Sequence, residues 1–84
     1  MSQERLVGTI CRYYDNSGMA VLELIDTLGV GQQIHIKGPR DDCLEVVEQM
    51  ELANHKIQFG LPGELVNIKI GQKIHENDKV FVRA

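Results

Sequence analysis

Residues 6–24 read LVGTICRYYDNSGMAVLEL, two apolar segments joined by the turn residues Asp15-Asn16-Ser17-Gly18. Asn and Gly tolerate the positive φ that a tight hairpin requires, and the Asp side chain can accept hydrogen bonds from the amides of the turn. On both sides of the turn, apolar residues recur at short range. The stretch therefore predicts an antiparallel hairpin, with strands over residues 6–14 and 19–24.

Turn signals also divide the rest of the chain into short segments. Gly, Pro, Asn and Asp cluster at residues 29–31, 38–41, 53–55, 60–63 and 76–78, which leaves segments of strand length between them. The further expected strands are residues 33–37, 43–47, 49–52, 57–59, 65–70 and 79–83. We expect one all-β domain over residues 1–84, a closed or nearly closed small antiparallel β-barrel of about six to eight strands, with residues 1–4 as a flexible N-terminus.

Within most of these segments apolar and polar residues alternate, so one face of each strand is suited to a core. In residues 33–37, for example, Ile34 and Ile36 point to the face opposite His35. The core predicted in this way consists of Ile10, Leu22, Leu24, Ile34, Ile36, Leu44, Met50, Leu52, Val66, Ile68, Val80 and Val82.

Residues 42–53 allow two interpretations. Asp42 and Glu45 have the spacing of a helix N-terminus, so a helix is the alternative. We favour two strands, because apolar residues recur with a period of two at positions 44 and 46 and again at 50 and 52. A bulge or corner near Glu48 would reconcile the two registers.

The composition is that of an ordinary globular domain, with 43% hydrophobic and 25% charged residues and a net charge of −3. Because generic nucleic-acid binders are usually basic, this charge argues against a phosphate backbone as a general partner. The sequence contains neither the apolar region of a signal peptide nor a membrane span of about 20 residues. We expect a cytoplasmic protein without membrane contact, in which Cys11 and Cys43 are reduced thiols; a disulfide is the less favoured alternative.

Five fragments in order carry a resemblance to a known family. They are VGTI (7–10), LGVGQQIHIKG (28–38), VEQMEL (47–52), PGELVNI (62–68) and IHENDKV (74–80). Together they resemble the second, β-barrel domain of elongation factor Tu and related translational GTPases, and in particular small stand-alone proteins of the translation elongation factor-like kind. The resemblance covers residues 7–83, although Gln32, Asn67 and Asn77 replace residues that are commonly Asp, Gly and Gly in that family.

The resemblance implies a non-catalytic, translation-associated binding module that contacts RNA, a ribonucleoprotein or a translation protein. The chain has no Gly-x-x-x-x-Gly-Lys-Ser/Thr loop, so it has no GTPase domain of that kind. A similar small barrel also ends some collagenase-like peptidases, where it is an accessory to the catalytic part. The alternative function is accordingly a protein-interaction or accessory barrel without nucleic-acid binding, which the acidic charge balance favours.

We find no residue pattern that specifies a reaction, a metal or another cofactor. The three histidines and two cysteines lack the close pairs of a structural zinc site. Asp41 and Asp42 could supply paired carboxylates, but no neighbouring histidine in the sequence supports acid–base chemistry. We therefore predict no catalytic, cofactor-binding or metal-ligating residue, and a chain that is not an enzyme.

A binding surface is the remaining candidate site. Arg12, Tyr13, Lys37 and Arg40 lie at expected strand ends and in the Gly38-Pro39-Arg40 loop, where barrels commonly display functional side chains. Tyr13 could stack on a base beside the cationic groups. The alternative is that a tyrosine closes one end of the barrel. We take these four residues as the hypothetical binding face.

Overall fold

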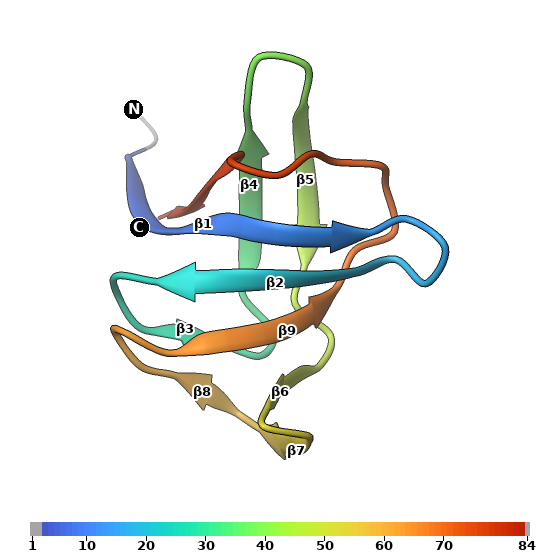
Figure 1. Ribbon diagram of the computed structural model, residues 1–84. Helices are drawn as coiled ribbons and strands as arrows, with labels where there is room; N and C mark the ends of the chain where they lie inside the picture. Colours follow the sequence, from blue (N-terminus) through green and yellow to red (C-terminus); the bar gives the residue numbers. More distant parts are fainter. Residues whose placement is uncertain (1–2, 84) are drawn as a thin grey trace.

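The computed structural model describes residues 3–83, which form ten strands and no helix (Figure 1). The strands are β1 (Glu4–Tyr14), β2 (Met19–Leu24), β3 (Leu28–Gly29), β4 (Gln33–Lys37), β5 (Asp42–Val46), β6 (Met50–Leu52), β7 (His55–Ile57), β8 (Phe59–Gly60), β9 (Leu65–Lys69) and β10 (Lys79–Arg83). The all-β prediction is confirmed. Glu4, which the sequence analysis assigns to a flexible N-terminus, begins β1 and pairs with Arg83.

The predicted hairpin is present as β1 and β2, which pair from Gly8 with Leu24 to Tyr14 with Met19. Its turn contains Gly18 at a φ of 77°, a conformation that glycine adopts without strain. The register of β1 shifts twice, between Leu6 and Gly8 against β10 and between Ile10 and Arg12 against β2. Such irregularities bend a strand and increase its twist, so β1 can curve around the core.

Eight of the strands form one antiparallel sheet in the order β5-β4-β10-β1-β2-β9-β6-β7. The sheet folds over on itself, and Figure 1 shows β4 and β5 running across the direction of β1, β2 and β9. Strands β3 and β8 form a separate two-stranded ladder, and just after β3 the Gly31 amide donates to the Val47 carbonyl at 2.7 Å. In residues 3–83 the outer strands β5 and β7 do not pair with each other, so the sheet is not closed into a barrel. This corrects the closed form of the predicted closed or nearly closed barrel.

The core fills the inside of the folded sheet, and all but two of the predicted core residues are buried. The exceptions are Leu44, which is 42% exposed, and Leu52, which is half-buried. Leu44 was assigned to the wrong face of β5. Because Ile34 pairs with Glu45 and Ile36 with Cys43, positions 43 and 45 share the inner face with the β4 isoleucines, and Leu44 points outward.

Several buried apolar residues were not predicted. They are Val7, Ala20, Leu28, Val47, Ile70 and Ile74. Most lie at strand ends or between strands, where the period-two alternation on which the prediction relied stops. Val47 occupies the corner between β5 and β6 and confirms that the chain changes direction near Glu48; residues 42–53 contain strands and no helix.

Across the described part of the chain, no helix is long and apolar enough to cross a membrane.

Candidate functional site

A surface pocket of about 700 Å³ lies where three segments meet. Tyr13 and Asp15 border it from the end of β1, Pro39 and Arg40 from the β4–β5 turn, and residues 73–78 from the segment that precedes β10. These segments are distant in the sequence, and the sheet order brings them together because β10 pairs with both β1 and β4.

Beside this pocket, two aspartates and a histidine converge. The Asp41 carboxylate accepts a hydrogen bond from Nδ1 of His75 at 2.7 Å, and the backbone amide of His75 donates to Oδ2 of Asp78 at 3.1 Å. One ligand atom from each of the three side chains lies within 4.8 Å of the other two. Asp78 is 1% exposed, and the Asp41 side chain is 9% exposed.

Two turns hold these side chains in place. Gly38 and Asp41 close the β4–β5 turn with a 2.8 Å hydrogen bond from the Gly38 amide to the Asp41 carbonyl. Asn77, at a φ of 76°, shapes the second turn and donates through its amide to the Ile10 carbonyl at 2.7 Å, which ties that turn to β1. Asn tolerates this left-handed conformation better than most residues do, so the turn forms without the glycine common in the resembled family.

Gly38 is packed directly against Asp78. A Cβ atom on residue 38 would lie 1.9 Å from Oδ1 of Asp78, much closer than any van der Waals contact. The absence of a side chain at residue 38 is therefore what allows the Asp78 carboxyl group to reach its buried position.

The pKa values of the Asp41 and Asp78 carboxyl groups are shifted in opposite directions. Burial raises the pKa of Asp78, and the neighbouring Asp41 raises it further. The hydrogen bond from the Asp78 carboxyl group lowers the pKa of Asp41, and His75 contributes in the same direction. The protonated form is thus favoured on Asp78 and the charged form on Asp41, as expected for adjacent carboxyl groups that cannot both ionise freely.

The structure divides the hypothetical binding face into two parts. Tyr13 and Arg40 both line the pocket. Arg12 is exposed on β1, and the Lys37 ammonium lies 5.7 Å from the centre of the Phe81 ring. Neither residue borders the pocket, so the structure does not bring the four residues together at one site.

The sequence analysis missed the Asp41–Asp78–His75 cluster. Asp41 was considered only with its chain neighbour Asp42, and His75 only as a possible zinc ligand with other histidines and cysteines. The sequence did offer one signal, because Asp41 and Asp78 both lie in predicted turns next to strands. Without the sheet order, however, residues 41 and 75 are 34 positions apart and nothing indicates that they meet.

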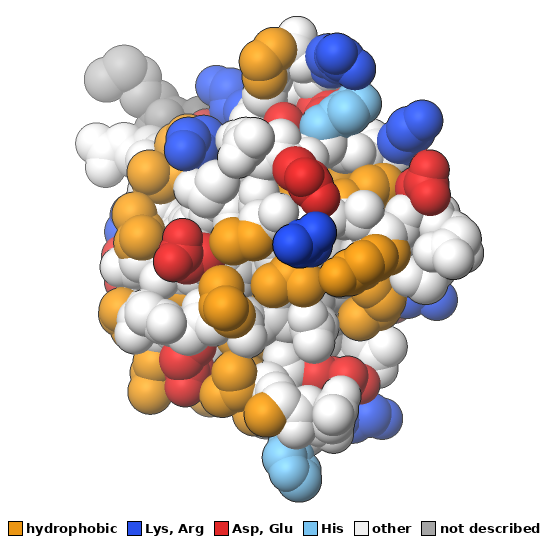
Figure 2. Space-filling model, viewed as in Figure 1, with side chains coloured by type: hydrophobic (Ala, Val, Ile, Leu, Met, Phe, Trp, Pro, Cys, Tyr) orange, Lys and Arg blue, Asp and Glu red, His pale blue; other side chains and the backbone are white. Residues whose placement is uncertain are grey.

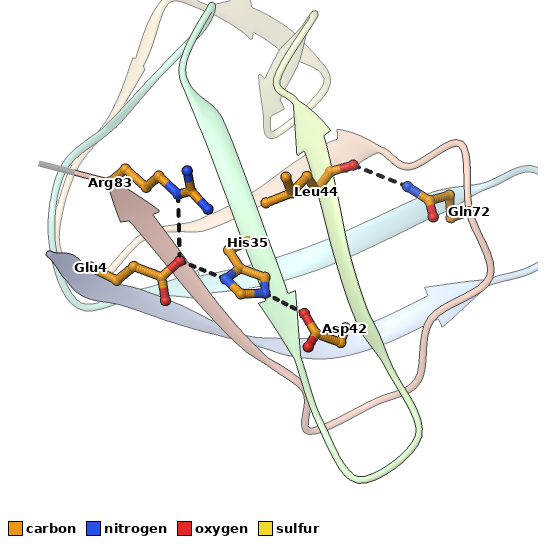
Figure 3. A network of polar contacts seen from close by, with 6 residues as sticks. All are labelled: Glu4, His35, Asp42, Leu44, Gln72 and Arg83. Atoms are coloured by element: carbon orange, nitrogen blue, oxygen red, sulfur yellow. Dashed lines mark hydrogen bonds and ion pairs between the residues drawn. The ribbon is translucent and has the colours of Figure 1, made fainter. Parts of the chain in front are cut away.

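A second polar network lies on the outer face of β4 (Figure 3). Nδ1 of His35 contacts the Glu4 carboxylate at 2.5 Å, and Nε2 contacts Asp42. Arg83 lies 3.9 Å from the same Glu4 oxygen. The hydrogen bond to Asp42, followed by the one to Glu4, raises the pKa of His35 above its usual 6.5. The network joins β1, β4, β5 and β10.

This network predicts a pH dependence of stability. Because folding raises the pKa of His35, its stabilising contribution is complete below about pH 6.5 and is lost as the pH rises through the folded-state pKa. We expect the difference in unfolding free energy between the wild type and His35→Gln to shrink over that range. Urea unfolding between pH 5 and 9 measures it, and NMR titration of His35 in folded and urea-unfolded chains is the control. A constant difference, or equal midpoints in the two states, would contradict the prediction.

Exposed apolar side chains mark another part of the surface. Ile25, Phe59, Leu61 and Leu65 are between 53% and 67% exposed. They lie on segments that meet at one end of the sheet, since Leu24 exchanges backbone hydrogen bonds with residues 63 and 64 and β8 pairs with β3. We call these four residues the apolar end. In Figure 2, hydrophobic side chains gather along the left edge, over the ends of β2 and β8 and the start of β9.

Comparisons with known proteins point to peptidases. The chain is 29% identical over 77 residues to an uncharacterized protease of Methanocaldococcus jannaschii; the match covers 90% of this chain but only 19% of the protease. The structure superposes with a TM-score of 0.86 on the crystal structure of the C-terminal domain of a proposed U32 peptidase of Geobacillus thermoleovorans, at 15% identity over 90% of this chain and 89% of that one. The selenomethionine variant of that domain gives a TM-score of 0.85. No protein-family model matches the chain.

These findings correct three predictions. The recognised relatives are peptidases rather than elongation factor Tu, so the predicted family resemblance is wrong and the translation-associated function that depended on it is overturned. The prediction that the chain is not an enzyme is likewise contradicted, because the relatives are named as a protease and a U32 peptidase. The sequence had shown only a secondary likeness to the barrel of collagenase-like peptidases. The fold is that of the C-terminal domain of the Geobacillus protein.

Proposed function

We propose that this chain serves as the C-terminal-type domain of a U32-type peptidase and docks onto the remainder of that enzyme through the apolar end. The observation that carries the proposal is the uneven coverage of the match. The similarity spans 90% of this chain and only 19% of the Methanocaldococcus protease, so about four fifths of that protease lies outside the matched domain. A domain joined to so large a remainder needs a surface that packs against it.

The apolar end has the composition of such a surface. Burial of a large apolar side chain contributes about 1.5–3 kcal/mol, so four exposed side chains are enough for the centre of an interface. Asp26, which follows Ile25 in the chain, forms an ion pair with Arg5 at 3.1 Å and offers a polar rim. The free thiols of Cys11 and Cys43 agree with a cytoplasmic location for this assembly.

The test is binding to the U32-type peptidases of the organism from which the chain comes, each produced without its own matching C-terminal segment. We expect a 1:1 complex by size-exclusion chromatography with light scattering, and a Kd measurable by calorimetry. The double variant Phe59→Ser, Leu61→Ser should weaken binding by about 100-fold or more, because central apolar contacts are each worth about 2 kcal/mol.

The matched control is the double variant Leu44→Ser, Val46→Ser. These side chains are 42% and 48% exposed and lie on β5. Within residues 3–83, strand β5 is hydrogen-bonded to residues 71 and 72, after the C-terminal end of β9, and not to the start of β9 that belongs to the apolar end. Their replacement should leave the Kd unchanged. The absence of a complex with every such peptidase would refute the proposed function. A complex that survives the Phe59, Leu61 replacement, or that the Leu44, Val46 replacement abolishes, would refute the docking surface.

A further inference from the structure

Two buried carboxyl groups beside the pocket lack a full cationic partner. The Asp41 side chain is 9% exposed, and Asp78 as a whole residue is 1% exposed. Among the ion pairs of residues 3–83, these two carboxyl groups have one partner, His75, which contacts Asp41 and whose side chain is 38% exposed. Ionised carboxylates are costly to bury unless a positive charge compensates them. The hydrogen bond from Asp78, then His75 and, at longer range, Arg40 lower the pKa of Asp41. No cation is paired with Asp78 among the ion pairs of residues 3–83. The two carboxyl groups are therefore suited to share a proton or to hold a cation.

The three side chains present their donor atoms to one point. The Nδ1 atom of His75 and the Oδ2 atom of Asp41 are 2.7 Å apart, and a donor atom of Asp78 lies within 4.8 Å of both. A tetrahedral zinc ion with bonds of about 2.0–2.2 Å separates its ligand atoms by about 3.3 Å. Because the three atoms lie within 4.8 Å of one another, their separations need to change by at most about 1.5 Å to reach that spacing.

The network around His35 is a useful comparison, because its carboxylates do not point toward a common site for an ion. His35 also contacts two carboxylates, but Glu4 binds Nδ1 and Asp42 binds Nε2. The two carboxylates thus lie on opposite sides of the imidazole ring (Figure 3) and cannot share one ion with it. The Asp41–Asp78–His75 cluster differs because its donor atoms are mutual neighbours.

The surroundings of the cluster restrain its ligands. The backbone amide of His75 donates to Oδ2 of Asp78, and the Ile10 amide donates to the Asp78 carbonyl at 2.9 Å. The missing side chain of Gly38 leaves the space that the Asp78 carboxyl group occupies. Hydrogen bonds of this kind orient metal ligands before the ion arrives.

The pocket supplies an entry path. His75 and Asp78 both line the cavity of about 700 Å³, so an ion can reach the cluster from solvent. Three protein ligands leave one position of a tetrahedral ion free, and that position would face the pocket.

We propose that Asp41, His75 and Asp78 form a binding site for a divalent transition-metal ion, with Zn²⁺ as the best fit. One imidazole and two carboxylates match zinc, whereas Mg²⁺ and Ca²⁺ prefer oxygen ligands alone. The ion replaces the shared proton between the carboxyl groups and joins the β4–β5 turn to the turn before β10. This inference is independent of the docking proposal, because it concerns a different part of the surface.

The experiment titrates the EDTA-treated, dialysed chain with Zn²⁺ alone, with isothermal calorimetry for stoichiometry and affinity and thermal unfolding as the second readout. We expect one Zn²⁺ per chain, a micromolar or tighter Kd, a higher melting temperature, and an NMR shift of His75 but not of His35. His75→Gln and Asp78→Asn should each weaken binding by more than about 100-fold, because changes to outer-shell partners alone cost about 10- to 100-fold.

His35→Gln is the matched control, since it removes a histidine that also contacts two carboxylates, and it should bind Zn²⁺ like the wild type. If Asp78→Asn fails to fold, His75→Gln still decides the question, because His75 is partly exposed and its loss leaves both carboxyl groups in place. No saturable Zn²⁺ binding below 1 mM, on the order of the weakest sites in proteins, would overturn the proposal. Binding that survives His75→Gln, or that disappears in His35→Gln, would overturn it as well.

Discussion

Replacing Leu22 with alanine should lower the free energy of unfolding by about 3 kcal/mol, the middle of the range for buried leucines. Leu22 is fully buried in β2 and pairs with Ile10 on one side and Val66 on the other, so it touches both neighbouring strands at the centre of the sheet. The cavity left by alanine cannot collapse without moving two strands. Urea unfolding followed by circular dichroism measures the loss.

The size of this effect follows from the small size of the domain. A chain of 84 residues has a total stability of only about 4–13 kcal/mol, at about 0.05–0.15 kcal/mol per residue. Leu65→Ala is the control, because Leu65 is 53% exposed in the neighbouring strand β9 and its replacement should cost less than about 0.5 kcal/mol. Similar losses in the two variants would show that Leu22 is not at the centre of the core.

Gly38→Ala should destabilise the fold by about 2 kcal/mol, the typical cost of forcing an extra carbon atom into a filled space. The new Cβ would lie 1.9 Å from Oδ1 and 2.7 Å from Cγ of Asp78. Asp78 can avoid it only by giving up its hydrogen bonds to the His75 amide and to Asp41. Chemical unfolding measures the change in stability, and the same variant should lose Zn²⁺ binding in calorimetry.

Gly71→Ala provides the matched control, because its new Cβ would meet nothing closer than the Glu45 carboxylate at 3.7 Å. A double-mutant cycle identifies the cause of the Gly38 effect. In an Asp78→Ala background, Gly38→Ala should cost less than about 0.5 kcal/mol because the clash is gone. An equal cost in both backgrounds would show that the effect comes from the turn itself rather than from contact with Asp78.

The relation between sequence and structure differs from one element to another. The β1–β2 hairpin could be predicted because its turn, its strand lengths and its alternation are all local properties. Strand β5 could also be predicted, but its inner face could not. Its alternation places Leu44 and Val46 on one face and Cys43 and Glu45 on the other, and only the pairing with β4 decides which face is buried.

Closure of the sheet was a matter of long-range geometry. The number of strands predicted from the sequence is compatible with a small barrel. Closure also requires the two outer strands to pair, and β5 and β7, at the two ends of the sheet order, do not pair in residues 3–83. The two register shifts in β1, of a kind that bends strands, leave no clear mark in the sequence. The family resemblance rested on short strand-and-turn fragments, and such local patterns do not fix which distant strands pair.

By itself the sequence determined that this protein is an all-β domain, where most of its strands and turns lie, and most of its core, because these depend on turn chemistry and on a period of two that neighbouring residues express. Only the tertiary structure decided the order of the strands, the outward orientation of Leu44 and the meeting of Asp41 with His75 and Asp78. Those properties depend on which distant segments pair. Pairing is selected by the burial of the whole core and by the curvature of β1, which no short stretch of sequence contains.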